Sequence, residues 1–259
     1  MNQNYRNLLS LQKLKFYFLQ KLFISWENLI GHFSLVGNPY FFEPQQFDWV
    51  KELESHWLEI RQELDRILLI VDELPNLQDI SLEQQTITQD NRWKTYFLYG
   101  YGFKIDKNCQ KCPETTELVE KIPGMKTAFF SILLPHKEIP EHQGYYKGVV
   151  RYHLGLVIPK LYKQCGIKIG NEVAHWEEGK SLLFDDAFTH QAWNKTDEIR
   201  VVLLIDVIRP LPFPFSSINR IVLNSISTSL FVEEALKNQA EWDKRLEKSL
   251  AKVTKSNSQ

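Results

Sequence analysis

RVVLLIDVIRP, residues 200–210, is the last of four β-rich segments that decide the fold of this chain. The other three are KTAFFSILLP (126–135), GVVRYHLGLVIP (148–159) and CGIKIGNEVAHWEEGKSLLFDD (165–186). Pro, Gly, Asn and Asp separate these segments, and no long helix fits among them. Several short strands at such spacing are typical of an antiparallel sandwich or jelly-roll barrel. The sequence therefore predicts a mainly β fold with flanking helices.

Helical patterns lie on the N-terminal side of these strands. Residues 8–33, LLSLQKLKFYFLQKLFISWENLIGHF, form an amphipathic pattern that Lys13, Lys15 and Lys21 interrupt. The interruptions leave too short an apolar run for a membrane-spanning helix. We expect this helix to dock on the protein's own core, and peripheral contact with a membrane remains an alternative.

A second helical pattern precedes the β-rich stretch. Apolar residues at spacings of three and four predict a helix whose tryptophans support the core: Trp49, Leu53, Trp57, Ile60 and Leu64. RWKTYFLYGYGFKID (92–106) has the composition of a strand, and a helix is expected at about 113–121.

After Pro210, LPFPFSSINR (211–220) breaks the pattern, and residues 231–253 form a charged helix. The predicted organisation is an N-terminal amphipathic segment (1–37), a jelly-roll domain (38–210) and a C-terminal helical tail (211–259).

Charge and cysteine content narrow the partners and the compartment. The net charge of -1 provides no global field that would recruit nucleic acid. Three cysteines cannot build a disulfide framework and no secretory signal is recognised, so we expect a cytoplasmic protein, with membrane-surface association left open. Cys109 and Cys112 form a C-x-x-C without a second pair, which excludes a four-cysteine zinc site. A loop is favoured for them over a redox pair.

Two histidines and an arginine carry the chemical signal. His142 is expected at the start of one strand, His190 at the end of a later turn, and Arg200 at the head of an apolar run. A buried arginine needs an anionic partner, which is either a nearby aspartate or a carboxylate ligand. Non-haem iron oxygenases combine two imidazoles with an arginine that binds 2-oxoglutarate, and their usual triad adds a carboxylate two residues after the first histidine. Gly144 occupies that place here.

The motifs RYHLGLVIP (151–159), HWEEGKSLLFDDAFTHQAWN (175–194) and RVVLLIDVIRP resemble the aspartyl/asparaginyl β-hydroxylase family of Fe(II)- and 2-oxoglutarate-dependent dioxygenases. The resemblance runs from about Phe41 to Pro210 and implies a double-stranded β-helix of the jelly-roll, cupin-like kind. It also implies Fe(II), 2-oxoglutarate and O₂ as cofactor and cosubstrates. In the family the first motif is His-x-Gly, so the resemblance makes His142 and His190 the metal ligands without a protein carboxylate.

The same resemblance implies roles for further residues. Asp186 matches a residue that orients a metal-bound water, and Arg200 matches the clamp on the distal carboxylate of 2-oxoglutarate. Three residues match positions that line the cosubstrate: Arg151, His153 and Ser131. Beside the metal, the loop GYYKG either contacts the substrate through Tyr145, Tyr146 and Lys147 or is an exposed turn.

Three functions follow as hypotheses. The first is hydroxylation of an unactivated C–H bond, at the β-carbon of Asp or Asn in a peptide or protein. The second is hydroxylation of a lipid A acyl chain at the membrane surface, because RPLPFPFSSINRIV (209–222) and the C-terminal helix resemble the tails of bacterial relatives that do so. The third is a non-catalytic jelly-roll binding protein.

Overall fold

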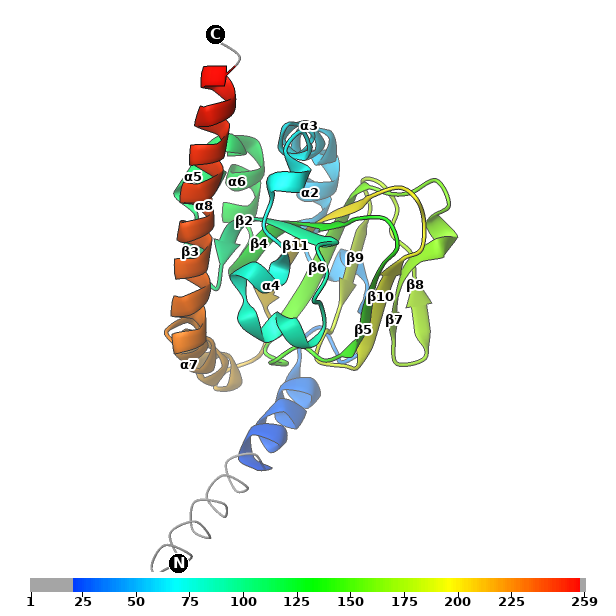
Figure 1. Ribbon diagram of the computed structural model, residues 1–259. Helices are drawn as coiled ribbons and strands as arrows, with labels where there is room; N and C mark the ends of the chain where they lie inside the picture. The colour runs from blue at the N-terminus through cyan, green and yellow to red at the C-terminus, as the bar shows by residue number, and fades with distance from the viewer. Residues whose placement is uncertain (1–20, 257–259) are drawn as a thin grey trace, which may run out of the picture.

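Two antiparallel sheets form the centre of the computed structural model, which describes residues 21–256, with side chains for residues 21–246 (Figure 1). The larger sheet contains, in spatial order, β1 (Phe41–Phe42), β9 (Ser181–Phe184), β6 (Val149–Val157), β11 (Arg200–Ile208), β4 (Met125–Leu133), β2 (Trp93–Gly100) and β3 (Phe103–Lys104). The smaller sheet contains β5 (Lys137–His142), β10 (His190–Asn194), β7 (Cys165–Ile169) and β8 (Glu172–Ala174). This confirms the predicted mainly β jelly roll with flanking helices.

Both faces of the larger sheet are buried, and the alternation of side chains along its strands explains how. Phe130 and Leu203 pack into a core cluster shared with the flanking helices. Their neighbours Phe129 and Leu204 pack into a second cluster shared with the smaller sheet. Successive residues of a strand point to opposite faces, so the continuous apolar runs of β4 and β11 supply two cores at once.

Helices α2 (Val50–Ser55), α3 (Trp57–Leu68) and α6 (Pro113–Glu120) cover the outer face of the larger sheet (Figure 1). Ile60 and Leu64 are fully buried, and Trp49 and Trp57 pack partly buried against the core, as the spacing predicts. The predicted helix at 113–121 is also present. The predicted strand at 92–106 is a hairpin of β2 and β3, because Tyr101 and Gly102 turn the chain with positive φ angles.

Two expectations about local structure are wrong. LPFPFSSINR does not merely interrupt the pattern, because α7 (Phe215–Ser227) begins directly after Pro214 and α8 (Leu230–Ser256) follows it. Cys109 lies in helix α5 (Asp106–Lys111) rather than in a loop. Cys112 separates α5 from α6, whose first residue is Pro113, a residue suited to the first helical turn. Both thiols are free and buried.

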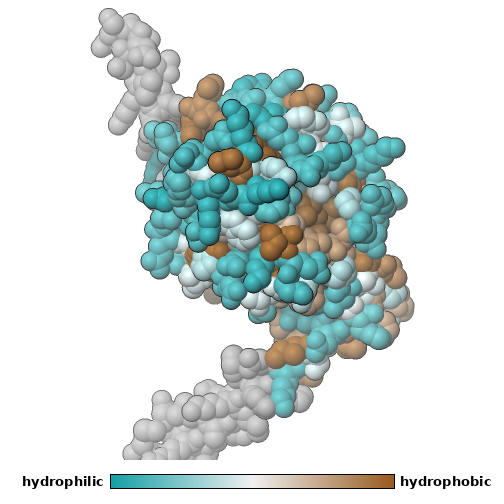
Figure 2. All heavy atoms as spheres, turned by 90° about the vertical axis from the view of Figure 1, so that its right-hand side faces the viewer, coloured by the Kyte–Doolittle hydropathy of each residue, from teal (hydrophilic) through white to brown (hydrophobic). Residues whose placement is uncertain are grey.

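The described part of the N-terminal helix, residues 21–33, docks on the body of the protein along one side, where Trp26 Nε1 donates to the Tyr146 hydroxyl at 2.8 Å. Ile30 is fully buried and shares a small cluster with Tyr146, Leu211 and Leu223. Leu22 and Ile24 are half-exposed, and residues 8–20 of the predicted helix lie outside the described residues. Within residues 21–256, none of the helices combines the length and the apolar character needed to cross a bilayer. Figure 2 shows hydrophobic side chains grouped where this helix joins the body of the molecule.

Candidate active site

The two predicted ligand histidines face each other across neighbouring strands. His142 is the last residue of β5 rather than the first of a strand, and His190 is the first residue of β10; the two are paired in register. Their ring centroids lie 4.1 Å apart. Antiparallel pairing of β5 with β10 therefore brings together two side chains that are far apart in the sequence.

Both imidazoles are oriented by backbone carbonyls. His142 Nδ1 lies 2.8 Å from the carbonyl oxygen of Pro140, and His190 Nδ1 lies 2.8 Å from that of Phe188. A carbonyl oxygen only accepts, so each Nδ1 carries the hydrogen and each Nε2 keeps its lone pair. Burial lowers the pKa of His142, and burial together with His142 lowers the pKa of His190 to about 3. Neutral imidazoles held in this tautomer are suited to bind a metal through Nε2.

Gly144 and Asp186 occupy the place next to the histidines. A Cβ atom built on Gly144 would lie 2.3 Å from Asp186 Oδ2, and the Gly144 amide donates to the Asp186 carbonyl at 2.7 Å. Asp186 Oδ1 is buried without a hydrogen-bond partner. Burial raises the pKa of Asp186 to about 6 against the attraction of Arg151. Among the described residues, no group of three or more His, Cys, Asp or Glu side chains is arranged so that it could hold a metal ion.

Arg151 is held by two carboxylates. Its Nε and Nη2 donate to the two oxygens of Asp206 at 2.8 and 3.0 Å, and its Nη1 lies 3.0 Å from Asp186 Oδ2. Arg151 and Asp206 are direct partners in the pairing of β6 with β11. Sequence reasoning missed Asp206, although a carboxylate inside the apolar run RVVLLIDVIRP is a signal that it has a buried partner.

Arg200 is buried, and within the described structure it has no acidic partner. Its Nη1 donates to the carbonyl of Ser131 at 3.3 Å and its guanidinium carbon lies 4.5 Å from the ring centroid of Trp176, while Nε has no hydrogen-bond partner. Burial lowers its pKa to about 10. The first alternative that the sequence left open, a neighbouring aspartate, is therefore not met by any side chain that the structure describes. A buried guanidinium that is not neutralised by a carboxylate of the described residues is a suitable partner for the carboxylate of a ligand.

His153 adds a second unpaired group beside Arg200. Its Nδ1 accepts a hydrogen bond from Trp176 Nε1 at 3.1 Å, which leaves Nε2 as a buried donor without a partner. Phe184 connects this group to the histidine pair, because its ring centroid lies 4.9 Å from that of His153 and 6.2 Å from that of His190. Ser131 Oγ accepts a hydrogen bond from Trp93 Nε1 at 3.1 Å.

The three predicted substrate residues have different environments. Tyr145 is largely exposed and borders a cavity beside His142. Tyr146 also borders the cavity, but it is buried and its hydroxyl donates to Asn219 Oδ1 at 2.7 Å. Lys147 is not an exposed residue, because its Nζ lies 2.7 Å from the buried Asp185 Oδ2 and 3.9 Å from the Phe188 ring centroid. The structure thus corrects the expectation for Lys147, whose charge is used within the fold.

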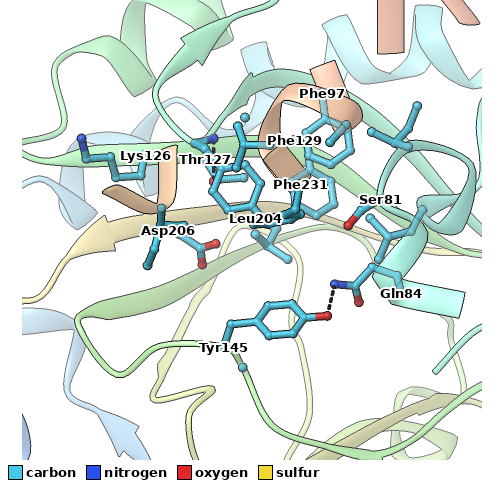
Figure 3. Close-up of a pocket in the computed structure, with 18 of the residues that line it drawn as sticks. Ser81, Gln84, Phe97, Lys126, Thr127, Phe129, Tyr145, Leu204, Asp206 and Phe231 are labelled. Atoms are coloured by element: carbon cyan, nitrogen blue, oxygen red, sulfur yellow. Dashed lines mark hydrogen bonds between the residues drawn. The ribbon is translucent and has the colours of Figure 1, made fainter. Parts of the chain in front are cut away.

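A cavity of about 280 Å³ opens beside His142, Arg151 and Asp186 (Figure 3). Its walls are mainly apolar and come from four parts of the chain: α4 (Leu77–Ile80) with the turn after it, the sheet strands β2, β4 and β11, α7, and α8. Figure 3 shows Phe97, Phe129, Leu204 and Phe231 close together among the residues that line the cavity. Tyr145 accepts a hydrogen bond from Gln84 at 3.5 Å. Sequence reasoning missed the contribution of α8, because its charged residues obscure a narrow apolar stripe.

The fold and the histidine pair define a class of protein, jelly-roll proteins with a two-histidine site beside a substrate-sized cavity. The sequence profile described as "Aspartyl/Asparaginyl beta-hydroxylase" matches residues 54–210. The chain belongs to the aspartyl/asparaginyl β-hydroxylase family, and this membership makes it a hydroxylase.

Relatives within the family are named for different substrates. An ornithine lipid ester-linked acyl 2-hydroxylase of Rhizobium tropici is 44% identical over 86% of this chain and 79% of its own length. The human aspartyl/asparaginyl beta-hydroxylase is 34% identical over 62% of this chain, which spans only 21% of the length of that relative. Among solved structures, a Cupin 2 conserved barrel domain protein of Salinispora arenicola aligns over 52% of this chain and 87% of its own, at 10% identity and a TM-score of 0.30. The fold assignment rests on the strand pairing and not on this likeness.

Proposed function

We propose that this protein is an Fe(II)- and 2-oxoglutarate-dependent hydroxylase that acts on an acyl chain of a membrane lipid. The observation that carries the proposal is the apolar cavity, which begins at His142 and Asp186 and is lined by aromatic and aliphatic side chains. An acyl chain matches such walls along its whole length, whereas a peptide backbone would leave polar groups unpaired against them. The similarity to the Rhizobium tropici lipid hydroxylase supports the same substrate class.

The residues fit the implied metal and cosubstrate. His142 and His190 would hold Fe(II) through their free Nε2 atoms, and the cosubstrate would supply oxygen donors that a protein carboxylate supplies elsewhere. The chemistry supplied by the bound iron is the insertion of one atom of O₂ into a C–H bond as a hydroxyl, while the other atom enters succinate as 2-oxoglutarate loses CO₂.

The remaining site residues bind and orient. Arg200 would pair with the distal carboxylate of 2-oxoglutarate, which removes the cost of its buried, unpaired charge. His153 Nε2 would donate to the same ligand, with Ser131 beside it. Asp186 Oδ1 is free to accept a hydrogen bond from a water beside the histidine pair, and Arg151 is kept in one orientation by Asp186 and Asp206.

Exposed apolar side chains support contact with a membrane surface. Leu22 and Ile24 on the helix over residues 21–33 are half-exposed. Phe213, just before α7, is exposed by 83%, and Ile221, in the middle of α7, is exposed by 65%. Amphipathic helices with such residues lie in the interface of a bilayer, where a lipid substrate is presented. Sedimentation with lipid vesicles tests this contact directly.

The decisive experiment offers both substrate classes to the purified protein with Fe(II), ascorbate and 2-oxoglutarate. A lipid extract containing ornithine lipid and an Asp- and Asn-containing peptide library are incubated separately and analysed by mass spectrometry. We expect a one-oxygen mass increment on the ester-linked acyl chain of the lipid. His142→Ala and His190→Ala should abolish it, and His56→Ala, which changes a half-exposed histidine outside the site, should not. An increment on the peptides alone would instead establish the peptide β-carbon as the substrate.

A further inference from the structure

Helix α8 forms one wall of the cavity although it lies outside residues 54–210, which the family profile matches. Five of its residues line the cavity at the spacing of a single helical face: Phe231, Val232, Ala235, Leu236 and Gln239. The intervening residues Glu233, Glu234 and Lys237 are exposed. The helix is therefore amphipathic, and its narrow apolar stripe is used to line a cavity.

The stripe has a defined beginning and end. At its start, the ring centroid of Phe231 lies 6.3 Å from that of Tyr145 and 5.1 Å from that of Tyr101 (Figure 3), and Tyr145 follows His142 closely in the chain. At its other end, the stripe finishes with Gln239, a polar residue whose side-chain Nε2 donates to Asp243 at 2.8 Å. With a rise of about 1.5 Å per residue, the stripe from Phe231 to Gln239 is about 12 Å long.

Hydrogen bonds to neighbouring segments hold α8 in place. Asn238 Nδ2 donates to the carbonyl of Ile80 at 3.1 Å, and Trp242 Nε1 donates to the carbonyl of Glu73 at 3.2 Å. Ile80 itself lines the cavity, on the element that α8 packs against. These hydrogen bonds fix the position of α8 relative to α4. The width of the cavity along α8 therefore depends on the size of the side chains on the stripe. Ala235 is the smallest of these side chains, and it lies midway along the stripe.

We propose that α8 sets the length of acyl chain that the enzyme accepts, with Ala235 as the residue whose small size lets the chain continue past the middle of the cavity. Phe231 borders the first part of the path, beside Tyr145, and Gln239 marks its end. The inference rests on the proposed function, because it names the element that selects among lipid substrates. It predicts that enlarging residue 235 shortens the accepted chain without affecting the histidine site.

The test compares Ala235→Phe with Ala240→Phe, the same substitution on the exposed face of the same helix. Synthetic ornithine lipids that differ only in the length of the ester-linked chain, short or long, serve as substrates. In Ala235→Phe, we expect the ratio of kcat/KM for the long chain to that for the short chain to fall about tenfold or more, as expected when a hydrophobic pocket loses room for several methylenes. Short-chain turnover should persist, which shows that the variant is folded. Ala240→Phe should keep the parent ratio.

A binding measurement removes the dependence on catalysis. Iron-free protein is titrated with a fluorescent fatty acid series of increasing chain length, and the cut-off length of Ala235→Phe is compared with that of the parent. A shorter cut-off in Ala235→Phe supports the inference even if the proposed reaction fails. An unchanged cut-off and an unchanged kcat/KM ratio overturn the inference while leaving the lipid hydroxylase function intact. An equal loss for all chain lengths, with a melting temperature like that of the parent, also overturns it. Leu236→Ala, which widens the same stripe, should extend the cut-off.

Discussion

A Cβ atom at Gly144 would lie 2.3 Å from Asp186 Oδ2, so the glycine of the His-x-Gly motif is required by the aspartate that packs against it. The carboxylate of the usual facial triad would stand on residue 144. In this protein a carboxylate from the other side of the site fills the same region, carried by the segment that leads into β10. The motif and the distant aspartate are therefore one structural unit.

The first prediction concerns this unit. Gly144→Asp should not restore a triad but should inactivate the enzyme, and Gly144→Ala should destabilise the fold by about 1–3 kcal/mol, as overpacking of buried sites does. Urea unfolding measures the change. Gly100→Ala is the matched control, because an added Cβ there has no atom within 4 Å. In an Asp186→Ala background, which removes the carboxylate atoms that the added Cβ would meet, Gly144→Ala should cost less stability than it does in the parent; an equal cost in both backgrounds would show that the contact is not the cause.

The second prediction separates the two neighbouring aspartates of the FDD motif. Asp185 is fully buried and Oδ2 pairs with both Lys147 and Arg209, at 2.7 and 2.6 Å. Asp185→Ala leaves two buried cations unpaired and should cost about 3–5 kcal/mol of unfolding free energy. Asp186→Asn keeps the shape of its side chain and should lower activity far more than stability.

Urea unfolding and succinate formation distinguish the two variants. Asp197→Ala, at a side chain exposed by 95%, serves as the control and should change neither quantity. Equal losses of stability in the Asp185 and Asp186 variants would contradict the division of roles.

The third prediction uses the unpaired charge of Arg200. Without ligand, Arg200→Met should melt at the same temperature as the parent or higher, because it removes a buried guanidinium that has no carboxylate partner among the described side chains. In the presence of Mn(II), 2-oxoglutarate at about a hundred times its Kd should stabilise the parent by about 2.7 kcal/mol and leave Arg200→Met unchanged. Arg220→Met, on the exposed face of α7, should respond like the parent. Equal stabilisation of both variants would remove Arg200 from the cosubstrate site.

The fourth prediction concerns the C-x-x-C motif. Burial raises the pKa of Cys112 to about 12 and raises those of Cys109 and Cys165. Thiolate forms only as pH approaches the raised pKa, so all three thiols stay protonated and shielded at pH 8. The native protein should react with a thiol reagent about a hundredfold more slowly than the urea-unfolded protein. Rapid reaction of two thiols in the native protein would revive the redox-pair interpretation.

Much of the fold can be read from local pattern. The short apolar runs in KTAFFSILLP and RVVLLIDVIRP predict strands, and they are continuous because both faces of the sheet are buried. Helices at Trp57–Leu68 and Pro113–Glu120 follow from spacing and from the proline at a helix start. The start of α7 was missed, because LPFPF looks like a break until the helix has somewhere to dock, which in this structure is the cluster around Tyr146 and Leu211.

The mainly β class, the His-x-Gly motif and the family of the chain depend on residue type and short-range spacing, so they can be recognised without coordinates. The three-dimensional fold was needed to show that Lys147 is paired with Asp185, that Arg151 is held by Asp206, and that Arg200 has no carboxylate partner among residues 21–246. It alone placed α8 against the cavity. Each of these is a contact between residues distant in the chain, and such contacts follow from the pairing of strands and the docking of helices rather than from any local pattern.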